Sequence, residues 1–386
     1  MNILIYSYNF LPKDRGGMEK YLLSLVQRLK NKHKIVLVLP NRHNISLNNV
    51  KIYNIHGIKV KSDIKNTLGF TSLFLSSLSI LSSFISTFII LPFILIKNKI
   101  DIINVFQPSP NASAVISIAR LFRKKSIINL RGLEGDASLI YQLSLDFTFL
   151  FSNMIIINSR DLLKRYIQTS HLPKFLFSKK KGYYLPNGIN TDYWKPDKTE
   201  KIDKKFDLVF VGNLADKSQI KNKGIKFLYE AIRILSKNNL NLKVVVIGHA
   251  NMHLLKKIIA PDIKNYFDFD GFVENYGIIK NKLQKSRIFV LPSVSEGMPN
   301  SLMEAMALEI PCIASNVGGV PELIENNVDG LTFESKNSRK LADLIRLLLE
   351  DENLQKKLGI NARKKMVDKF NWNQIITKLE ILYGKL

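Results

Sequence analysis

Residues 290–307 decide the fold, and they read Val-Leu-Pro-Ser-Val-Ser-Glu-Gly-Met-Pro-Asn-Ser-Leu-Met-Glu-Ala-Met-Ala. The apolar run at 288–291 predicts a buried strand. Pro299 suits the first turn of a helix, so we expect a helix soon after the strand. Open α/β sheets bind their ligands at the carboxyl ends of the strands. We therefore expect a ligand site between this strand and this helix.

Two glutamates in this stretch, Glu296 and Glu304, are candidates for sugar recognition. The free amides of the expected first turn, those of Asn300, Ser301 and Leu302, should point at an anion such as a diphosphate. Carboxylates are poor phosphate ligands, but they accept hydrogen bonds from hydroxyl groups. An isolated pair with this spacing is more often two surface acids. Beside the amides it indicates a sugar nucleotide, with Glu304 on the ribose and Glu296 near the transferred sugar or its acceptor.

Strands and helices alternate through both halves of the chain. Apolar runs at 2–6, 34–39, 100–105, 126–130 and 154–157 predict a parallel, doubly wound sheet in the first half. A second series starts at 206 and continues at 242–248, 267–272, 287–292 and 311–315. We predict an α/β fold of two Rossmann-like domains facing a cleft. The first domain covers 1–186, the second covers 187–365, and a helix at 366–386 packs back on the first.

The composition is that of a folded, strongly basic protein. Of 386 residues, 57 are Lys or Arg and 32 are Asp or Glu, which gives a formal net charge of +25 and makes polyanions natural partners. The sequence contains no zinc-finger spacing, RNA-binding run or basic region joined to heptads, so we expect no nucleic acid. The single cysteine, Cys312, excludes an internal disulfide and a multi-thiolate metal site, and we expect a core thiol.

Residues 66–96 contain no charged side chain. Three interpretations stay open, namely a membrane span, a helix on a membrane surface, or an ordinary buried helix. The same expected domain carries a basic cluster made of Arg120, Arg123, Lys124 and Lys125, with further lysines at Lys97, Lys99 and 179–181. The N-terminal residues have no secretory signal pattern. We expect a cytoplasmic protein, peripheral on the inner face of the cell membrane.

Several further motifs point to a known family. Beyond residue 307 the sequence contains Pro311, Gly318-Gly-Val-Pro-Glu-Leu-Ile and Asp329-Gly-Leu-Thr-Phe. With the stretch from Leu291 they resemble the donor-binding half of glycosyltransferase family 4, whose members are retaining enzymes with the GT-B fold. Other matches are Val211-Gly212, Lys223-Gly224, Val246-Ile-Gly248, Asp270-Gly-Phe-Val273 and Leu185-Pro-Asn-Gly-Ile-Asn-Thr-Asp192. The resemblance covers nearly the whole chain and is most specific at 185–333.

The resemblance implies roles for several donor-side residues. In that family the second glutamate binds the ribose, the first lies beside the donor sugar, and an arginine and a lysine hold the diphosphate. Glu304, Glu296 and Lys223 match the two glutamates and the lysine. Asn213 stands at the arginine position, and Lys217 is a candidate replacement for the missing cation.

The remaining expected donor contacts follow the same resemblance. Val273 belongs to the donor side through its matching motif, together with the amides of Asn300, Ser301 and Leu302. Lys221 is a second candidate for the missing cation, and phosphate binding by amides alone is the other possibility.

The first half contributes a glycine loop and an arginine. Gly16-Gly17-Met-Glu resembles the loop that approaches the donor phosphates in the family, although a lone glycine pair is more often a turn. The histidine expected beside the sugar is replaced by Arg131, in a run that ends at Asp136. We expect Glu296, Arg131 and Asp136 to be catalytic. The general base stays open between Asp136, Glu134 and the leaving phosphate.

Histidines also follow the strand at 100–105 in many family members. This chain has Asn104 and Phe106 there. Asp268-Phe-Asp270 formally spells the D-x-D metal signature of another glycosyltransferase fold class. Because the triplet falls in an expected strand, we treat it as chance and expect no metal and no other cofactor.

The resemblance implies retaining transfer of a sugar from a nucleotide sugar, preferably a UDP-sugar, to a glycan acceptor. The apolar stretch and the basic cluster favour an acceptor linked to a polyprenyl diphosphate, as in the synthesis of a capsule or of lipopolysaccharide. Two alternatives stay open. One is a sugar-nucleotide epimerase with the same two-domain plan, and the other is a non-catalytic basic module that binds membrane surfaces.

Overall fold

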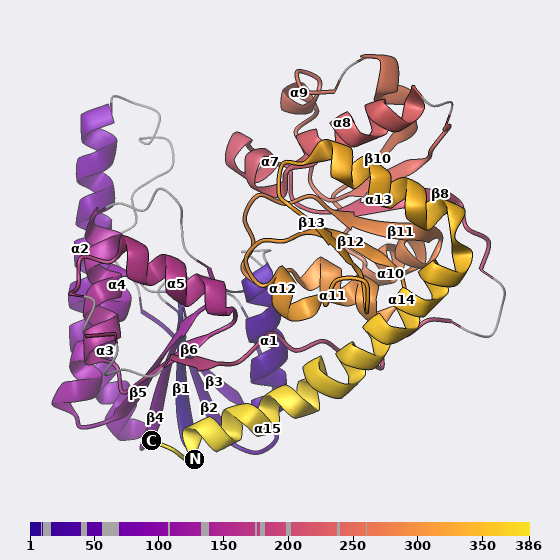
Figure 1. Cartoon of the computed structure of the whole chain (residues 1–386). Helices are drawn as coiled ribbons and strands as arrows, with labels where there is room; N and C mark the ends of the chain where they lie inside the picture. Colours follow the sequence, from indigo (N-terminus) through magenta and orange to yellow (C-terminus); the bar gives the residue numbers. More distant parts are fainter. Residues whose placement is uncertain are drawn as a thin grey trace. The chain divides into compact units, whose positions relative to one another are not determined.

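The computed structural model describes the chain except residues 9, 11–16, 40–44, 56–68, 107–108, 133–138, 174–175, 178–181, 198–201, 238–239 and 260, and the side chains of 69–80 and 261. The chain divides into two compact units. The first consists of Met1–Pro186 with Ile376–Leu386, and the second is Asn187–Ile375. Each is built on one parallel sheet with helices on its faces (Figure 1).

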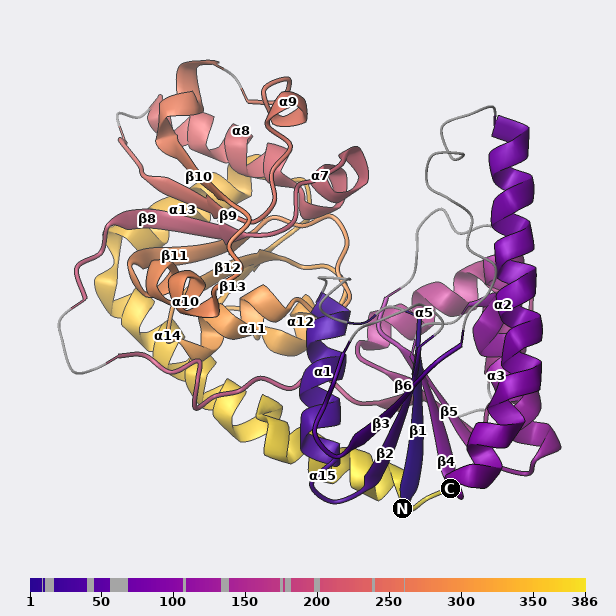
Figure 2. The ribbon, with the colours of Figure 1, turned by 180° about the vertical axis from the view of Figure 1, so that it is seen from behind.

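The first sheet has the strand order β3-β2-β1-β4-β5-β6-β7. Its strands are β1 Asn2–Ser7, β2 Lys34–Leu39, β3 Val50–Asn54, β4 Ile102–Phe106, β5 Lys125–Leu130, β6 Met154–Ile157 and β7 Gly182–Tyr184. Its helices are α1 Gly17–Leu29, α2 Gly69–Lys97, α3 Pro110–Leu121, α4 Leu139–Phe151 and α5 Arg160–Thr169. Residues of α2 to α5 share one apolar core over the sheet. Helix α1 covers the opposite face (Figure 2).

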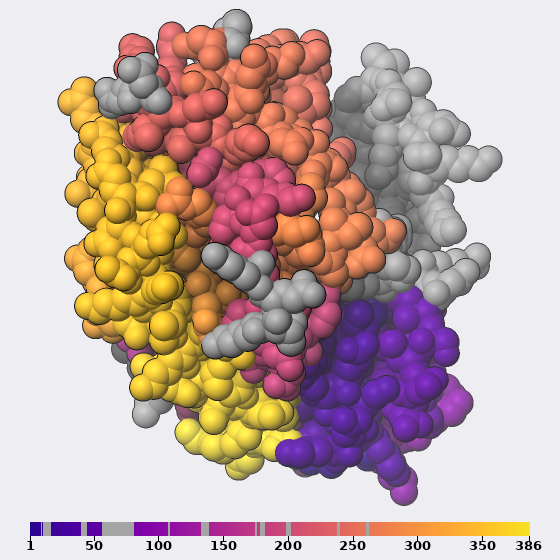
Figure 3. Space-filling model, turned by 90° about the vertical axis from the view of Figure 1, so that its right-hand side faces the viewer, coloured from indigo at the N-terminus to yellow at the C-terminus, as the bar shows by residue number. Residues whose placement is uncertain are grey.

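The second sheet has the order β10-β9-β8-β11-β12-β13. Its strands are β8 Phe206–Val211, β9 Val244–Ile247, β10 Phe267–Gly271, β11 Ser286–Leu291, β12 Cys312–Ser315 and β13 Leu331–Phe333. The helices of this unit are α7 Lys217–Lys223, α8 Ile225–Ser236, α9 Met252–Leu255, α10 Tyr276–Gln284, α11 Asn300–Ala307, α12 Val320–Leu323, α13 Ser338–Glu350 and α14 Glu352–Lys365, with a 3-10 helix at Pro261–Tyr266 and a π-helix at Met366–Phe370. Helix α15, Trp372–Tyr383, begins in the second unit and continues into the first. The C-terminal part of the chain, in yellow, lies on the surface (Figure 3).

The strands form where the sequence has short apolar runs. Every residue of β9 and β12 is buried, as expected for parallel strands covered on both faces. Cys312 is buried in β12, which confirms its predicted core position. Burial, followed by the charge of Asp329, raises the pKa of the Cys312 thiol well above its usual value.

The C-terminal segment differs from the prediction that all of 366–386 packs on the first domain. Residues up to Ile375 belong to the second unit. The amide of Ile189 donates to the carbonyl of Phe370 at 2.8 Å, and Ile189 pairs with Asn371 as an isolated bridge. Gly188 lies directly against the Trp372 ring, because a Cβ at residue 188 would be 2.5 Å from Trp372 Cδ2. These contacts hold the start of α15 to the second unit.

Residues from Ile376 onward belong to the first unit and contact it through a series of buried hydrogen bonds. Asn129 Nδ2 donates to Asn104 Oδ1, and Asn104 Nδ2 donates to Tyr383 Oη at 2.9 Å. Asn104, Asn129 and Tyr383 are all buried, and burial raises the pKa of the Tyr383 hydroxyl. Buried amides need such partners, so the tyrosine satisfies an asparagine in the middle of β4.

Helix α2 occupies most of the uncharged stretch, of which residues 66–68 lie outside the described part of the chain. Leu91, Ile94 and Leu95 are buried in the first unit's core. Among the residues described, no helix has the length and apolar character needed to cross a membrane.

Tyr383→Phe should lower the free energy of unfolding by about 1–3 kcal/mol, because Asn104 Nδ2 would be buried without its acceptor. Chemical denaturation followed by circular dichroism measures this loss. Ile381→Ala is the control on the same helix, since Ile381 is exposed and its truncation should change stability little. An unchanged transition in Tyr383→Phe would contradict the role of this hydroxyl.

Candidate active site

The carboxylate of Glu296 is buried, with only 9% of the residue exposed, and lies next to a lysine. Lys223 Nζ is 2.7 Å from Glu296 Oε1, and Ser293 Oγ donates to the same oxygen at 2.7 Å. Lys223 is the last residue of α7, whereas Ser293 and Glu296 lie in the loop between β11 and α11. The structure therefore brings together two residues that the sequence predicted for one site, and adds Ser293.

Glycines fix the backbone around this pair. Gly318 has φ +57°, and a Cβ there would lie 1.9 Å from the carbonyl oxygen of Glu296. Gly319 then donates its amide to the carbonyl of Gly297 at 2.7 Å. Gly224 has φ +61°, and a Cβ at this residue would lie 2.0 Å from the carbonyl oxygen of Pro292. Side chains at Gly224 and Gly318 would push these loops apart, so both glycines are required by close approach.

Helix α11 begins beside this loop. Pro299 is the residue before the helix, with φ −74° and ψ 113°, so the prediction that it lies in the first turn is wrong by one position. The first-turn residues are still Asn300, Ser301 and Leu302, and the N-cap residue Pro299 makes no side-chain capping hydrogen bond. Their amides carry the partial positive charge of a helix N-terminus, which favours an anion.

Asn187 positions the start of α11. Its Nδ2 donates to the carbonyl of Met298 at 3.2 Å and to Asn300 Oδ1 at 2.9 Å. The sequence offered a signal for this residue, because Asn187 belongs to the Pro-Asn-Gly motif at the domain junction. We did not predict its role.

Glu304 lies in the second turn of α11 and is half-buried. Tyr193 lies near it. Burial is the main cause that raises the pKa of Tyr193, and the charges of Glu304 and Tyr276 add to it. Helix α11 thus carries, in order, the amides of its first turn and a carboxylate one turn further along.

The other expected donor residues have different surroundings. Asn213 is exposed, and its Oδ1 accepts from the amide of Ala215 at 3.1 Å. Lys217 is exposed at the first position of α7. Val273 is half-buried just after β10. The donor roles of Asn213, Lys217 and Val273 stay predictions.

The Asp268-Phe-Asp270 triplet lies in β10, as the sequence predicted. Asp268 is exposed, while Asp270 forms an ion pair with Lys282 of α10. In the part of the chain that the structure describes, no group of three or more His, Cys, Asp and Glu side chains could hold a metal ion.

In the first unit, Arg131 follows the carboxyl end of β5 and contacts α1. Its guanidinium carbon is 3.8 Å from the centre of the Tyr21 ring, and Nη2 donates to Tyr21 Oη at 2.6 Å. Nη1 donates to the carbonyl of Leu185 at 3.4 Å. Burial lowers the pKa of Arg131, yet a guanidinium stays charged in proteins. A fixed cation therefore lies at the carboxyl end of the first sheet.

Gly17 begins α1, at the same end of the first sheet. Gly16, Glu134 and Asp136 lie outside the described residues, so their predicted roles are not placed by the structure. Asn104, which replaces a histidine expected from the family, is buried in β4 and donates to Tyr383. At this buried position the asparagine side chain links β4 to β5 and to the last helix by hydrogen bonds.

The two halves of the chain match two family models. Residues 15–193 match the model described as Glycosyltransferase Family 4, and residues 194–365 match the one described as Glycosyl transferases group 1. The capsular polysaccharide biosynthesis glycosyltransferase CapM of Staphylococcus aureus is 27% identical over 314 residues, which are 75% of this chain and 77% of CapM. A UDP-Gal:alpha-D-GlcNAc-diphosphoundecaprenol alpha-1,3-galactosyltransferase of Escherichia coli is 30% identical over 213 residues, 52% of this chain and 53% of its own.

Solved structures show the same fold. HepE of Anabaena in complex with UDP has a TM-score of 0.75 at 16% identity, with all of both chains covered. The sucrose-phosphate synthase of Thermosynechococcus elongatus has a TM-score of 0.78 at 16% identity, covering 100% of this chain and 98% of that one. The predicted two-domain Rossmann-like architecture, its family and its enzyme class are thereby confirmed. The chain belongs to glycosyltransferase family 4 and is a glycosyltransferase with the GT-B fold.

Proposed function

We propose that this glycosyltransferase transfers a sugar from a UDP-sugar, with retention of configuration, to a glycan acceptor carried on a polyprenyl diphosphate. The observation that supports it most is the Lys223–Glu296 pair beside the loop that leads into the N-terminus of α11. Cation and amides suit a diphosphate, and the carboxylates suit sugar hydroxyls. The names of the relatives from Staphylococcus aureus and Escherichia coli support capsule or related surface polysaccharide synthesis as the process.

In the proposed reaction, the bond between the anomeric carbon and the diphosphate oxygen breaks, and its electron pair leaves with the nucleoside diphosphate. The acceptor hydroxyl oxygen forms the new bond on the same face of the sugar. Lys223 and the amides of Asn300, Ser301 and Leu302 stabilise the charge on the leaving diphosphate. The hydroxyl proton passes to that phosphate, to Asp136 or to Glu134.

The remaining donor contacts are proposed on the same basis. Glu304 accepts the ribose hydroxyls, and Val273 lies on the nucleoside side. Lys217 and Asn213 border the diphosphate, while Glu296 faces the transferred sugar. Because fixed amides and Lys223 neutralise the phosphate charge, we propose that no metal or other cofactor is needed.

The first unit is proposed to bind the acceptor. Arg131 is held by Tyr21 at the carboxyl end of β5, where it can bind an oxygen of the sugar or the acceptor. Gly16 and Gly17 are proposed to approach the donor phosphates through their backbone. A lipid-linked acceptor places the enzyme on the cytoplasmic face of the membrane as a peripheral protein, and we propose no nucleic acid partner.

The function is tested by calorimetric titration with UDP, GDP and ADP, followed by donor turnover with and without an extract of lipid-linked acceptors. UDP should bind most tightly, and turnover should depend on the acceptor. Turnover of the donor without any acceptor would favour an epimerase, and no nucleotide binding would reject both enzymes.

Glu304→Ala should lower kcat/KM for the donor at least about tenfold, because a charged hydrogen-bond acceptor to the ribose contributes roughly 1.5–3 kcal/mol. Steady-state kinetics measure the effect. Glu350→Ala is the control, since Glu350 is exposed at the end of α13 in the same unit. Wild-type kinetics in Glu304→Ala would reject the ribose assignment.

Lys223→Ala should likewise lower kcat/KM at least about tenfold and weaken UDP binding, since it removes a cation from the diphosphate. Lys226→Ala removes an exposed lysine three residues later and should behave like the wild type. Equal UDP affinity in the two variants would place the diphosphate elsewhere.

Treatment with EDTA should leave turnover unchanged, because Lys223 and helix amides supply the positive charge that a metal would otherwise provide. Activity is measured before chelation, after chelation and after addition of magnesium or manganese. Loss of activity that either metal restores would show that the phosphate charge is neutralised by a metal.

A further inference from the structure

The outward face of α2 is apolar and exposed to solvent. Leu91, Ile94 and Leu95 face the core, and the opposite side of the helix exposes a stripe of large apolar residues. The stripe consists of Leu81, Ile85, Phe88, Ile89, Phe93 and Ile96, of which Ile89 is 71% exposed. Charged side chains normally occupy the solvent side of a surface helix, so this face is built for another environment.

Helix α4 repeats the pattern on the same side of the sheet. It packs against α3, which also packs against α2, and all three helices bury residues in one core. Its exposed residues are Leu139, Ile140, Leu143 and Phe151, the first two each 61% exposed. The outward faces of α2 and α4 therefore point the same way.

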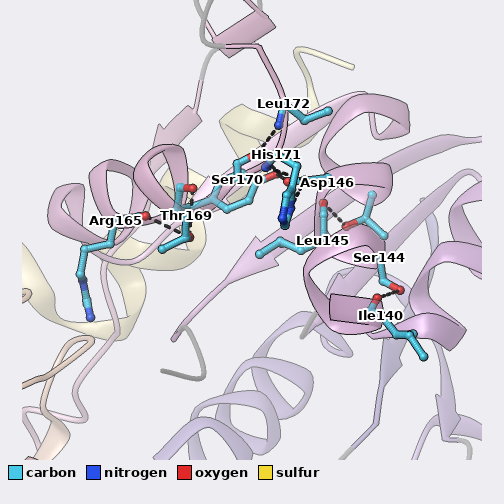
Figure 4. A network of polar contacts seen from close by, with 11 residues as sticks. Ile140, Ser144, Leu145, Asp146, Arg165, Thr169, Ser170, His171 and Leu172 are labelled. Atoms are coloured by element: carbon cyan, nitrogen blue, oxygen red, sulfur yellow. Dashed lines mark hydrogen bonds and ion pairs between the residues drawn. The ribbon is translucent and has the colours of Figure 1, made fainter. Parts of the chain in front are cut away.

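The single charged residue of α4 is turned away from this surface. Asp146 is buried and accepts from Ser170 Oγ at 2.6 Å and from the amide of His171 at 3.0 Å (Figure 4). It also accepts from Tyr166 Oη at 2.9 Å. The helix thus keeps a carboxylate for internal hydrogen bonds and presents no acid outward.

Cations border the apolar residues. Lys97 Nζ lies 5.3 Å from the centre of the Phe93 ring, and Arg120 Cζ lies 5.2 Å from that of Phe151. At the end of α3, Leu121 is 76% exposed, and the basic run Arg123, Lys124 and Lys125 follows the helix. An apolar stripe with a basic border suits an anionic lipid surface, because the apolar side chains enter the headgroup boundary and the cations meet lipid phosphates.

We propose that the α2/α4 face docks this enzyme on an anionic membrane. The α2/α4 face is defined as the ten apolar residues given above for α2 and α4, and its basic border as Lys97, Arg120, Arg123, Lys124 and Lys125. This inference rests on the proposed lipid-linked acceptor and assigns the surface that meets the lipid. A protein partner would need acidic groups opposite this border, and a second copy of the chain would bring the same cations together.

The test uses tryptophan as a local probe in the full chain, since Trp194 and Trp372 are buried. Ile89→Trp reports on α2 and Leu143→Trp on α4, and Ile360→Trp on α14 is the control at an exposed apolar site of the second unit. Vesicles are made of phosphatidylcholine, alone or with about a third phosphatidylglycerol.

Emission from both α2 and α4 probes should shift to shorter wavelength with the anionic vesicles, and less in high salt, while the control stays unchanged. No shift in either probe, or a shift in only one of them, would overturn the docking face. A shift that grows with protein concentration without vesicles would show that a second copy covers it.

Charge reversal gives an independent measurement. Arg123, Lys124 and Lys125 changed together to Glu should reduce sedimentation with anionic vesicles at least about tenfold. Lys356, Lys357 and Lys364, all exposed on α14, are changed to Glu as the matched control and should bind like the wild type. Equal binding by the two triple variants would contradict the proposal.

A UDP-binding measurement distinguishes failure of the docking face from failure of the proposed function. The variants at Arg123, Lys124 and Lys125 should keep wild-type affinity for UDP, because none of these three residues is among the proposed donor contacts. A wild-type protein that binds vesicles but no nucleotide would reject the proposed function and leave the docking face in place.

Discussion

The second unit's site depends on a carboxylate that is withdrawn from water. Burial of an ionised Glu296 is costly unless charge and hydrogen bonds compensate it, and Lys223 and Ser293 provide both. The lysine comes from the end of α7, so α7 must end close to the loop after β11. Gly224 permits that approach, and Gly318 permits the approach of the loop after β12. The Lys223–Glu296 ion pair and the two glycines therefore fix the loop that leads into α11.

Much of this arrangement could be predicted from the sequence. Buried parallel strands can be predicted from their apolar runs without knowing which strands they pair with. In the structure the chain divides after Pro186, where the prediction placed the change of domain. Glu296, Glu304 and Lys223 were singled out through motifs, and the structure places Glu296 beside Lys223. Ser293 and Asn187 were not, because a serine or asparagine in a loop gives no signal until the atoms it contacts are known. The start of α15 illustrates the same limit, since the packing of Trp372 on Gly188 joins residues far apart in the sequence.

Asn104 and Arg131 of the first unit stand where the family resemblance predicts histidines, and both have well-defined contacts within the unit. The side-chain amide of Asn104 donates to Tyr383 on the last helix. Arg131 replaces another histidine, and Tyr21 holds it by a hydrogen bond and by its ring. A guanidinium cannot act as a base near neutral pH. In the proposed reaction the first unit therefore supplies a fixed positive charge, and the proton is accepted by Asp136, by Glu134 or by the leaving phosphate.

The apolar face of α2 and α4 stays free of acidic groups because Asp146, the charged residue of α4, is buried. A carboxylate on the outer side of α4 would oppose both the apolar stripe and the phosphates that the basic border attracts. The fold turns it inward, where Tyr166, Ser170 and His171 satisfy it. Helix α3 also uses a polar side chain for a contact within the unit, because Ser113 donates to the carbonyl of Ser144 on α4. Polar groups of these helices are thus used to join them to one another, and the surface that remains is one that water alone would not favour.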